Sequence, residues 1–269
     1  MELYVKGLFQ LSICVLLVLF GCDFQEQKKS MNVKAPAMEQ LVSHINWQHI
    51  GNLPPASGYD ESIGISGHFA GFIGDYLIVA GGTNFPDGHP YFDSAAKTFY
   101  SDVWVFDVSN QELSLVSKAN LPITAAYGAT VANEGKLYFV GGQNDKGELS
   151  TIIEVELKGV TPSIRKESEL PFTWSQGGAA IYNQALYLFA GTQNGLVTNA
   201  VCRYSFDSGK CEVKSAPEKL PDVGRVQFPF IHQDNKFYMF GGINGKGDKG
   251  QKVLTNTHVY DFAKNDWQT

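Results

Sequence analysis

The sequence predicts an all-β protein in which four-stranded antiparallel sheets recur along the chain. Two observations predict this class. Four segments share one pattern, an apolar strand that ends in two small residues and then turns polar: "LIVAGGTN" (77–84), "LYFVGGQN" (137–144), "LYLFAGTQN" (186–194) and "FYMFGGIN" (237–244). The second small residues, Gly82, Gly142, Gly191 and Gly242, are 60, 49 and 51 residues apart, a spacing typical of stacked structural repeats.

Each repeat shows the same order of elements. A Leu-Pro pair precedes a short apolar strand, a tight turn, the strand that ends in the small pair, a third strand such as "VWVFD", and a last strand that carries Trp47 or Trp267 in the best copies. The turns are "GD" (74–75), "NEG" (133–135), "NQ" (183–184) and "DN" (234–235), residues that tight hairpins require. Because the strands are apolar on both faces, the sheets must stack on each other, which favours a β-propeller. The small pairs are then explained by the close approach of the strand ends, where a Cβ would collide with neighbouring atoms and where a positive φ favours glycine.

The repeats resemble kelch repeats, which have Gly-Gly after an apolar strand, an aromatic-Asp pair in the third strand and a Trp in the fourth. The segment "ISGHFAGFIGDYLIVAGGTNFPDGHPYFDSAAKTFYSDVWVFD" (65–107), with its long insertion after Gly-Gly, and "AAYGATVANEGKLYFVGGQ" (125–143) are similar to the N-acetylneuraminate mutarotase (epimerase) group of kelch propellers. This resemblance implies a six-bladed propeller, of which four repeats are present.

The order of repeats is similar to the cyclically permuted branch of that group. "INWQHIGNLPP" (45–55) has the pattern of a last strand without earlier strands of its own. We therefore expect a partial propeller over 44–269, with two further repeats beyond Thr269. Its predicted parts are a closing strand (44–52), blade 1 (53–118), blade 2 (119–167), blade 3 (168–216) and an incomplete blade 4 (217–269).

The first residues predict export. Lys6 precedes an apolar stretch, Leu8–Phe20, that has the length of a signal-peptide core and is too short to span a bilayer comfortably. It leads into "LFGC" (19–22), which resembles a bacterial lipobox. We expect a lipoprotein signal peptide (1–21), a lipidated Cys22, a polar tether (22–43) and a cell-envelope location, in the periplasm or on the outer membrane. An ordinary secretory peptide is the alternative.

Charge and motifs exclude several classes. The net charge is −6 and the pI about 5.5, without a basic run, so nucleic acid is not an expected partner. The sequence lacks H-E-x-x-H, C-x-x-C and G-x-S-x-G, and we expect neither a metal nor a cofactor. Cys202 and Cys211 flank a predicted hairpin; a disulfide and two buried thiols are both compatible with the sequence.

The resemblance implies a mutarotase that interconverts the anomers of N-acetylneuraminate (sialic acid). Ring opening and closure need a proton donor for the ring oxygen and an acceptor for the anomeric hydroxyl. The group's Glu and Arg lie in a Gly-Glu-x-x-Pro-Gly-x-Arg stretch that this sequence lacks, and we expect them beyond Thr269. The catalytic residues are thus unassigned, and it stays open whether the 269 residues are active by themselves. The alternative is a non-catalytic propeller that binds a glycan or a protein.

Several residues are candidates for substrate binding. Arg225 stands 16 residues before Gly241. Its guanidinium group could bind the sugar carboxylate, and the alternative is a structural role in which its aliphatic stem packs across the edge of a blade. His68 starts a strand near the same rim, and Lys97, Tyr91 and Tyr100 lie in the insertion, where they could instead cap the ring. An amide stands two residues after each second small residue and could bind sugar hydroxyls or cap its own loop: Asn84, Asn144, Gln193 and Asn244.

Overall fold

The computed structural model describes residues 45–213, 220–245 and 251–268. The predicted signal peptide, Cys22 and the tether lie outside these residues. The chain divides into two units, Met1–Gln48 and His49–Thr269, and every strand belongs to the second. The described residues form strands only, and none of them builds a helix that could cross a membrane. The all-β prediction is therefore confirmed.

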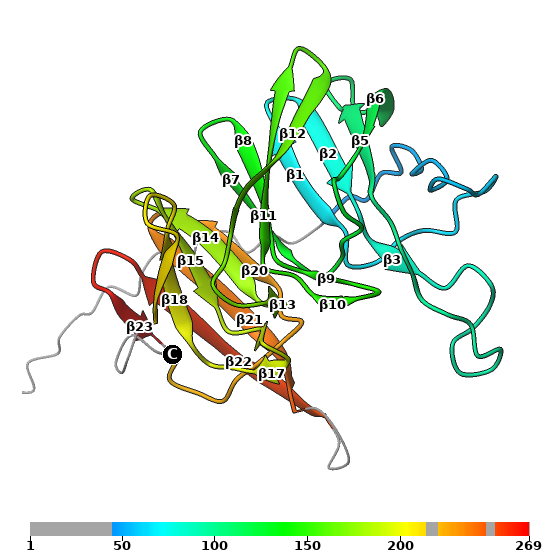
Figure 1. The fold of residues 1–269 in the computed structure, drawn as a ribbon. Helices are drawn as coiled ribbons and strands as arrows, with labels where there is room; N and C mark the ends of the chain where they lie inside the picture. Colours follow the sequence, from blue (N-terminus) through cyan, green and yellow to red (C-terminus); the bar gives the residue numbers. More distant parts are fainter. Residues whose placement is uncertain (1–44, 214–219, 246–250, 269) are drawn as a thin grey trace, which may run out of the picture. The chain divides into compact units, whose positions relative to one another are not determined.

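Four antiparallel sheets of four strands each follow one another along the chain (Figure 1). In every sheet the strands pair in chain order, as in a meander. Blade 1 consists of β1 (Phe69–Ile73), β2 (Tyr76–Ala80), β5 (Asp102–Asp107) and β6 (Ser114–Asn120). Blade 2 consists of β7 (Ala129–Asn133), β8 (Lys136–Val140), β11 (Thr151–Lys158) and β12 (Thr161–Glu169). Blade 3 consists of β14 (Gly178–Tyr182), β15 (Ala185–Phe189), β18 (Val201–Ser205) and β19 (Lys210–Val213).

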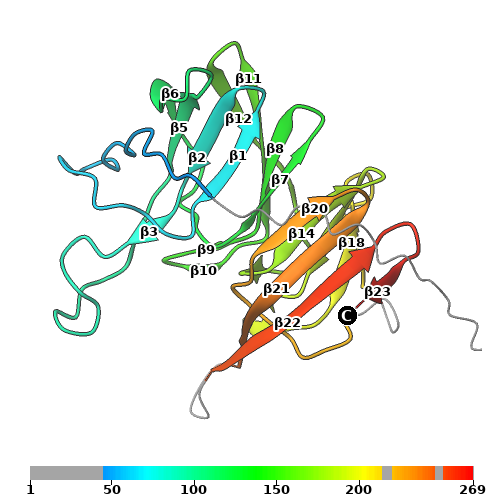
Figure 2. The ribbon, with the colours of Figure 1, turned by 180° about the vertical axis from the view of Figure 1, so that it is seen from behind.

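The two middle strands of blade 4 are longer than those of the other blades, and Figure 2 shows β22 as a long arrow between β21 and β23. It consists of β20 (Phe230–Gln233), β21 (Lys236–Asn244), β22 (Lys252–Asp261) and β23 (Asp266–Gln268). In blades 1 to 3 the second strand ends before the small pair, and a separate short strand follows the pair. These short strands form small sheets of their own: β3 (Thr83–Asn84) pairs with β4 (Thr98–Phe99), and β9 (Gln143–Asn144) pairs with β10 (Gly147–Glu148). In blade 3, β16 (Thr192–Gln193) pairs with both β13 (Trp174–Ser175) and β17 (Leu196–Val197).

Two-residue turns join the first two strands of every blade, as predicted. In blades 2 to 4 both turn residues have positive φ, between 47° and 76°, which is the type I′ geometry that matches the twist of a hairpin. Asn, Asp and Gly tolerate this conformation best. The turns thus fix the register of each hairpin, and the register brings the small pair to the same end of every second strand.

Hydrophobic clusters join successive blades. One cluster connects blades 1 and 2, where Phe69 stacks on Phe139 with ring centroids 4.8 Å apart. A second cluster connects blades 2 and 3, and a third connects blades 3 and 4, where Phe189 stacks on Phe237 at 4.0 Å. The faces of neighbouring sheets therefore pack on each other, which is why the strands are apolar on both faces.

In blades 1 to 3 the small pair is where the second strand meets the next blade. The N–H of Gly82 donates to the carbonyl of Ala125 (2.9 Å), and the N–H of Gly142 donates to that of Trp174 (2.8 Å). A Cβ at Gly81 or Gly141 would lie 2.2 Å from these same carbonyl oxygens, and both glycines have φ near 60°. The predicted reason for the pair is confirmed: the backbone of the next blade occupies the space of a side chain.

Two differences from the predicted boundaries are visible. Residues 45–52 form no strand, and the first blade's sheet does not include them; the backbone N–H of Leu113 donates to the carbonyl of Ile50 (2.8 Å), a single bond of the kind that a strand pair would repeat. A strand needs a continuous row of such bonds, so the closing strand stays a prediction. The last strands of blades 1 and 2 run to Asn120 and Glu169, two residues past the predicted boundaries, because both strands continue to pair there.

Cys202 and Cys211 form a disulfide across the hairpin of β18 and β19, with their Cα atoms 5.8 Å apart. In the register Cys202 pairs with Val213 and Cys211 with Tyr204, so the two cysteines are diagonal neighbours on one face. This answers the question that the sequence left open.

Candidate functional site

The predicted site residues gather at one end of the blades. The first strand of each blade begins, and the second strand ends, at the edge that carries the small pair, which we call the glycine end. All the connections between second and third strands, including the insertion 85–97, start from this end. It therefore carries His68, Asn84, Lys97, Tyr100, Asn144, Gln193, Arg225 and Asn244.

The asparagine amides bind the backbone of their own blade. Each amide nitrogen donates to the carbonyl of the residue twenty positions earlier: Asn84 to Gly64 (2.8 Å), Asn144 to Thr124 (3.2 Å) and Asn244 to Gly224 (2.5 Å). In blade 3 the neighbour of Gln193, Asn194, accepts a bond from the N–H of Thr173 (3.2 Å). This geometry favours the loop-capping interpretation, and contact between these amides and a sugar stays a prediction.

Asn84 has a second partner. Its amide oxygen accepts a hydrogen bond from the hydroxyl of Tyr100 (2.6 Å), which is buried. Burial, together with the neighbouring Tyr59, raises the pKa of Tyr100 to about 12, so the phenol stays protonated and remains a donor. Tyr100 thus supports Asn84 rather than facing the solvent.

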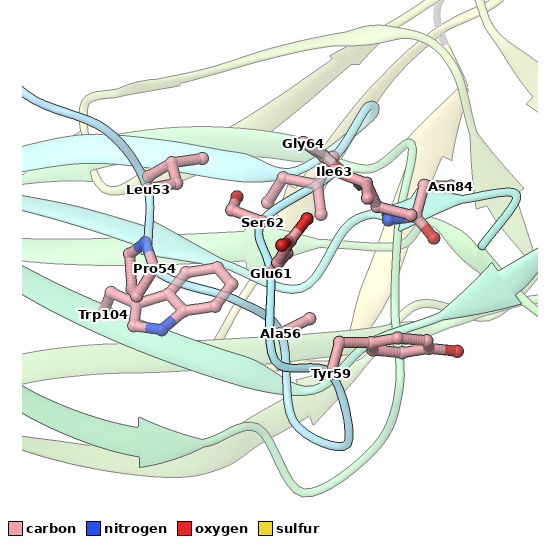
Figure 3. A pocket seen from close by; sticks show the side chains of 11 residues that line it. Leu53, Pro54, Ala56, Tyr59, Glu61, Ser62, Ile63, Gly64, Asn84 and Trp104 are labelled. Carbon is pink, nitrogen blue, oxygen red and sulfur yellow. Dashed lines mark hydrogen bonds between the residues drawn. The ribbon is translucent and has the colours of Figure 1, made fainter.

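Asn84 also lines a narrow pocket over the face of blade 1 that carries Trp104 and that Leu53 and Ala56 cover (Figure 3). Figure 3 shows Asn84 beside Gly64 at one end of the pocket and Trp104 beside Pro54 at the other. The cavity measures about 10 Å³, roughly the space of one water molecule. It is therefore too small for a sugar. A larger groove of about 390 Å³ borders Asn144, and its rim contains the ion pair of Lys166 with Glu169.

We expect Asn84→Ala to lower the free energy of unfolding by about 1–3 kcal/mol, because the Gly64 carbonyl and the Tyr100 hydroxyl both lose their partner. Thermal denaturation measures the loss. Asn110→Ala, in the exposed turn between β5 and β6, is the matched control and should change stability little. If Asn84→Ala is as stable as the control, the loop-capping interpretation is wrong.

Arg225 is buried, with none of its side chain exposed. Its Nη1 donates to the carbonyl of Gly241 (2.8 Å), and its Nη2 donates to the carboxylate of Asp222 (2.9 Å). In blade 3 Trp174 holds the same position, and its indole N–H donates to the carbonyl of Ala190 (2.9 Å), the residue equivalent to Gly241. Arg225 therefore binds the backbone of β21 at Gly241, as Trp174 binds the backbone at Ala190, just after β15. This geometry favours the interpretation in which the Arg225 side chain packs in the blade; contact between Arg225 and the carboxylate of a sugar stays a prediction.

The sequence analysis did not identify the partners of Arg225. Asn256 and His258 lie on β22, and the amide nitrogen of Asn256 donates to the carboxylate of Asp222 (2.7 Å). His258 Nε2 lies 3.1 Å from Arg225 Nη2. Hydrogen bonds from Asn256 and from the N–H of Val223 lower the pKa of Asp222, while burial and then the charge of Arg225 lower the pKa of His258. The cluster thus pairs the Asp222 carboxylate with the Arg225 guanidinium and keeps His258 neutral.

The remaining candidates lie beside the start of blade 1. Burial lowers the pKa of His68, and a hydrogen bond with the backbone of Ile65 opposes this shift. The ammonium group of Lys97 lies 3.4 Å from the hydroxyl of Tyr127 and over the rings of Tyr127 and Phe85, 5.1 and 5.4 Å from their centroids. Tyr91 is 89% exposed. Lys97 is thus a cation held by aromatic rings at the glycine end.

A row of four backbone positions links the blades just before their first strands. The N–H of Tyr127 donates to the carbonyl of Gly67 (2.6 Å), the N–H of Gln176 to that of Tyr127 (2.7 Å), and the N–H of Gln227 to that of Gln176 (3.0 Å). Each position stands fourteen residues before the first small residue of its repeat. We call these four residues the axial row, because the first strands that follow them are the inner strands at which successive blades meet.

Four stacked four-stranded blades with a glycine end define a kelch-type propeller, and the comparisons agree. A family model described as "KLHDC2/KLHL20/DRC7 Kelch-repeats domain" matches residues 67–269, so the chain belongs to the kelch-repeat family. The solved "Structure of YjhT" superposes with a TM-score of 0.58 at 17% identity, covering 78% of this chain and 70% of that one. This likeness supports the propeller fold.

Two curated relatives are similar over a shorter segment. The N-acetylneuraminate epimerase of Pasteurella multocida (strain Pm70) is 30% identical over 114 residues, 39% of this chain and 30% of the relative. That of Brucella melitensis biotype 1 is 35% identical over 111 residues, 38% of this chain and 28% of the relative. The matched segments therefore span less than a third of these relatives.

Proposed function

We propose that the protein is a sugar mutarotase that interconverts the anomers of N-acetylneuraminate. The observation that carries the proposal is the 30–35% identity to the two N-acetylneuraminate epimerases. The glycine end fits this role because it places the Lys97 cation over the ring of Tyr127 and the amides of Gln176 and Gln227 just before the first strands of their blades. Amides bind hydroxyls without the cost of burying a charge.

Mutarotation breaks and reforms the bond between the ring oxygen and the anomeric carbon. One group must donate a proton to the ring oxygen while another accepts the proton of the anomeric hydroxyl, and recyclisation on the opposite face completes the exchange. We expect this acid and base to be the Glu and Arg of the missing Gly-Glu-x-x-Pro-Gly-x-Arg stretch, outside the described residues. What the described residues supply is binding and orientation of the sugar acid, which raise the rate by holding the reacting atoms in place.

We also propose that lipidation of Cys22 holds the protein in the bacterial cell envelope. The apolar stretch Leu8–Phe20 and the "LFGC" motif support this location. A single acyl chain holds a protein only weakly, so a stable anchor would need more than one. Sialic acid taken up by the cell would meet the protein there.

The proposal predicts that the purified protein speeds the approach of α-N-acetylneuraminate to its anomeric equilibrium. A sialidase releases the α anomer, and proton NMR then follows its conversion with and without the protein; heat-denatured protein is the control. We expect at least a severalfold faster conversion. Binding of the sugar without acceleration would favour the non-catalytic alternative, and absence of both binding and acceleration would refute the proposal.

A further inference from the structure

The axial row bears side chains in a conformation that costs free energy. Tyr127, Gln176 and Gln227 have φ of 60°, 58° and 54°, in the left-handed region that favours glycine. Gly67, at the equivalent position of blade 1, shows that the fold accepts glycine there. The backbone bonds of the row involve only N–H and C=O groups, so they do not require the three side chains. Strained residues of this kind concentrate at ligand sites.

The first part of the row is an aromatic surface with a cation. The ring of Tyr127 lies against Gly67, where a Cβ would approach its atoms to 2.6 Å. Lys97 holds its ammonium group against the Tyr127 hydroxyl and over the Tyr127 ring. Within the described part of the chain Lys97 forms no ion pair with a carboxylate, and its side chain is exposed. This cation is therefore positioned to receive an anion from solution.

The second part of the row is a pair of amides. Gln227 Nε2 donates to Gln176 Oε1 (2.9 Å), which leaves the Gln176 nitrogen as a donor and the Gln227 oxygen as an acceptor. Gln227 is exposed and Gln176 half-buried. The backbone bond from Gln176 to Tyr127 keeps this pair next to the aromatic surface. A hydroxyl group, which both donates and accepts, is the complement of such a pair.

We propose that the axial row and Lys97 bind the sugar acid. Lys97, held over the Tyr127 ring, pairs with the carboxylate, and the amides of Gln176 and Gln227 bind hydroxyl or acetamido groups. The proposal rests on the proposed function and assigns its substrate to residues outside the predicted set, apart from Lys97. It also explains why tyrosine and glutamine occupy strained positions that glycine would fill at lower cost.

A double variant, Gln176→Gly with Gln227→Gly, tests the amides. Glycine removes the side chains and relieves the strain, so the variant should fold and melt at the wild-type temperature or above it. Gln111→Gly is the matched control, because Gln111 is an exposed glutamine with φ of 59° in the turn between β5 and β6, at the opposite end of the blade. In calorimetric titration with N-acetylneuraminate we expect the double variant to bind about tenfold more weakly or worse, and the control to bind as wild type.

Lys97→Gln tests the cation. The wild type should prefer N-acetylneuraminate to its methyl ester, which lacks the charge, and Lys97→Gln should lose this preference. Lys158→Gln, at an exposed turn of blade 2, should keep it. If wild type binds the sugar or speeds mutarotation while the axial-row variants do so equally well, the axial-row proposal is refuted and the proposed function stands. If wild type neither binds nor converts the sugar, both are refuted.

Discussion

Replacing Gly141 with alanine is expected to lower the free energy of unfolding by about 3 kcal/mol or more. The new Cβ would lie 2.2 Å from the carbonyl oxygen of Trp174, which accepts the hydrogen bond from Gly142. To make room, blades 2 and 3 must move apart at this point and weaken that bond. The left-handed backbone adds about 1–2 kcal/mol for any residue with a Cβ. For a domain of this size, the melting temperature should fall by roughly 6–12 °C.

Gly135→Ala separates the two contributions to this loss. Gly135 has φ of 76°, and nothing lies within 4 Å of the position that a Cβ would take there, so alanine meets only the backbone cost. We expect a loss of about 1 kcal/mol. Thermal denaturation of both variants, followed by circular dichroism, makes the comparison. Equal losses would show that the close approach of the Trp174 carbonyl contributes nothing to the effect.

The Arg225→Ala variant should lower the free energy of unfolding by about 3 kcal/mol, the low end of the range for breaking a buried ion pair, because Arg225 is fully buried whereas Asp222 is 32% exposed. The Asp222 carboxylate, the Gly241 carbonyl and the Asn256 amide would all lose the guanidinium group. A cavity the size of the side chain adds to the cost. Denaturant titration measures the loss.

Two further variants show whether charge or volume dominates. Arg225→Met keeps most of the buried volume and removes the donors, so it should lose less than Arg225→Ala. Combining it with Asp222→Asn removes the unpaired carboxylate and should recover part of the stability, which a double-mutant cycle reports as a coupling of about 1 kcal/mol or more. If the combined losses simply add, Asp222 and Arg225 are not coupled, and the structural role given to the pair is wrong.

The parts of the fold that local chemistry determines could be predicted from the sequence. The turn residues Asn183-Gln184 and Asp234-Asn235 indicated two-residue hairpins, and the spacing of the small pairs indicated the blades. The reason for the small pairs also followed, because two glycines after an apolar strand have few explanations other than close approach.

The contacts of the candidate site could not be predicted, because they join distant segments. Arg225 stood out by its position, but Asn256 and His258 lie more than thirty residues further on, in a strand whose own sequence does not indicate this contact. The sequence shows an amide residue in each repeat. It does not show where the side chain points, because that depends on a carbonyl twenty residues earlier in the chain. The axial row differs in residue type from blade to blade, so only its constant offset from the small pair could have revealed it.

The backbone bonds of the axial row join the blades whatever side chain each residue carries, and the hydrogen bond between the Gln227 and Gln176 side chains adds a further link between blades 3 and 4. A codon change at Tyr127, Gln176 or Gln227 to a residue other than proline replaces a side chain and keeps the backbone N–H and C=O groups that bond the blades. In these residues the backbone atoms thus stabilise the contact between blades, and the side-chain atoms determine ligand specificity. Ligand preference can therefore change through substitutions that keep the backbone bonds between blades. This makes the axial row a suitable target for laboratory evolution.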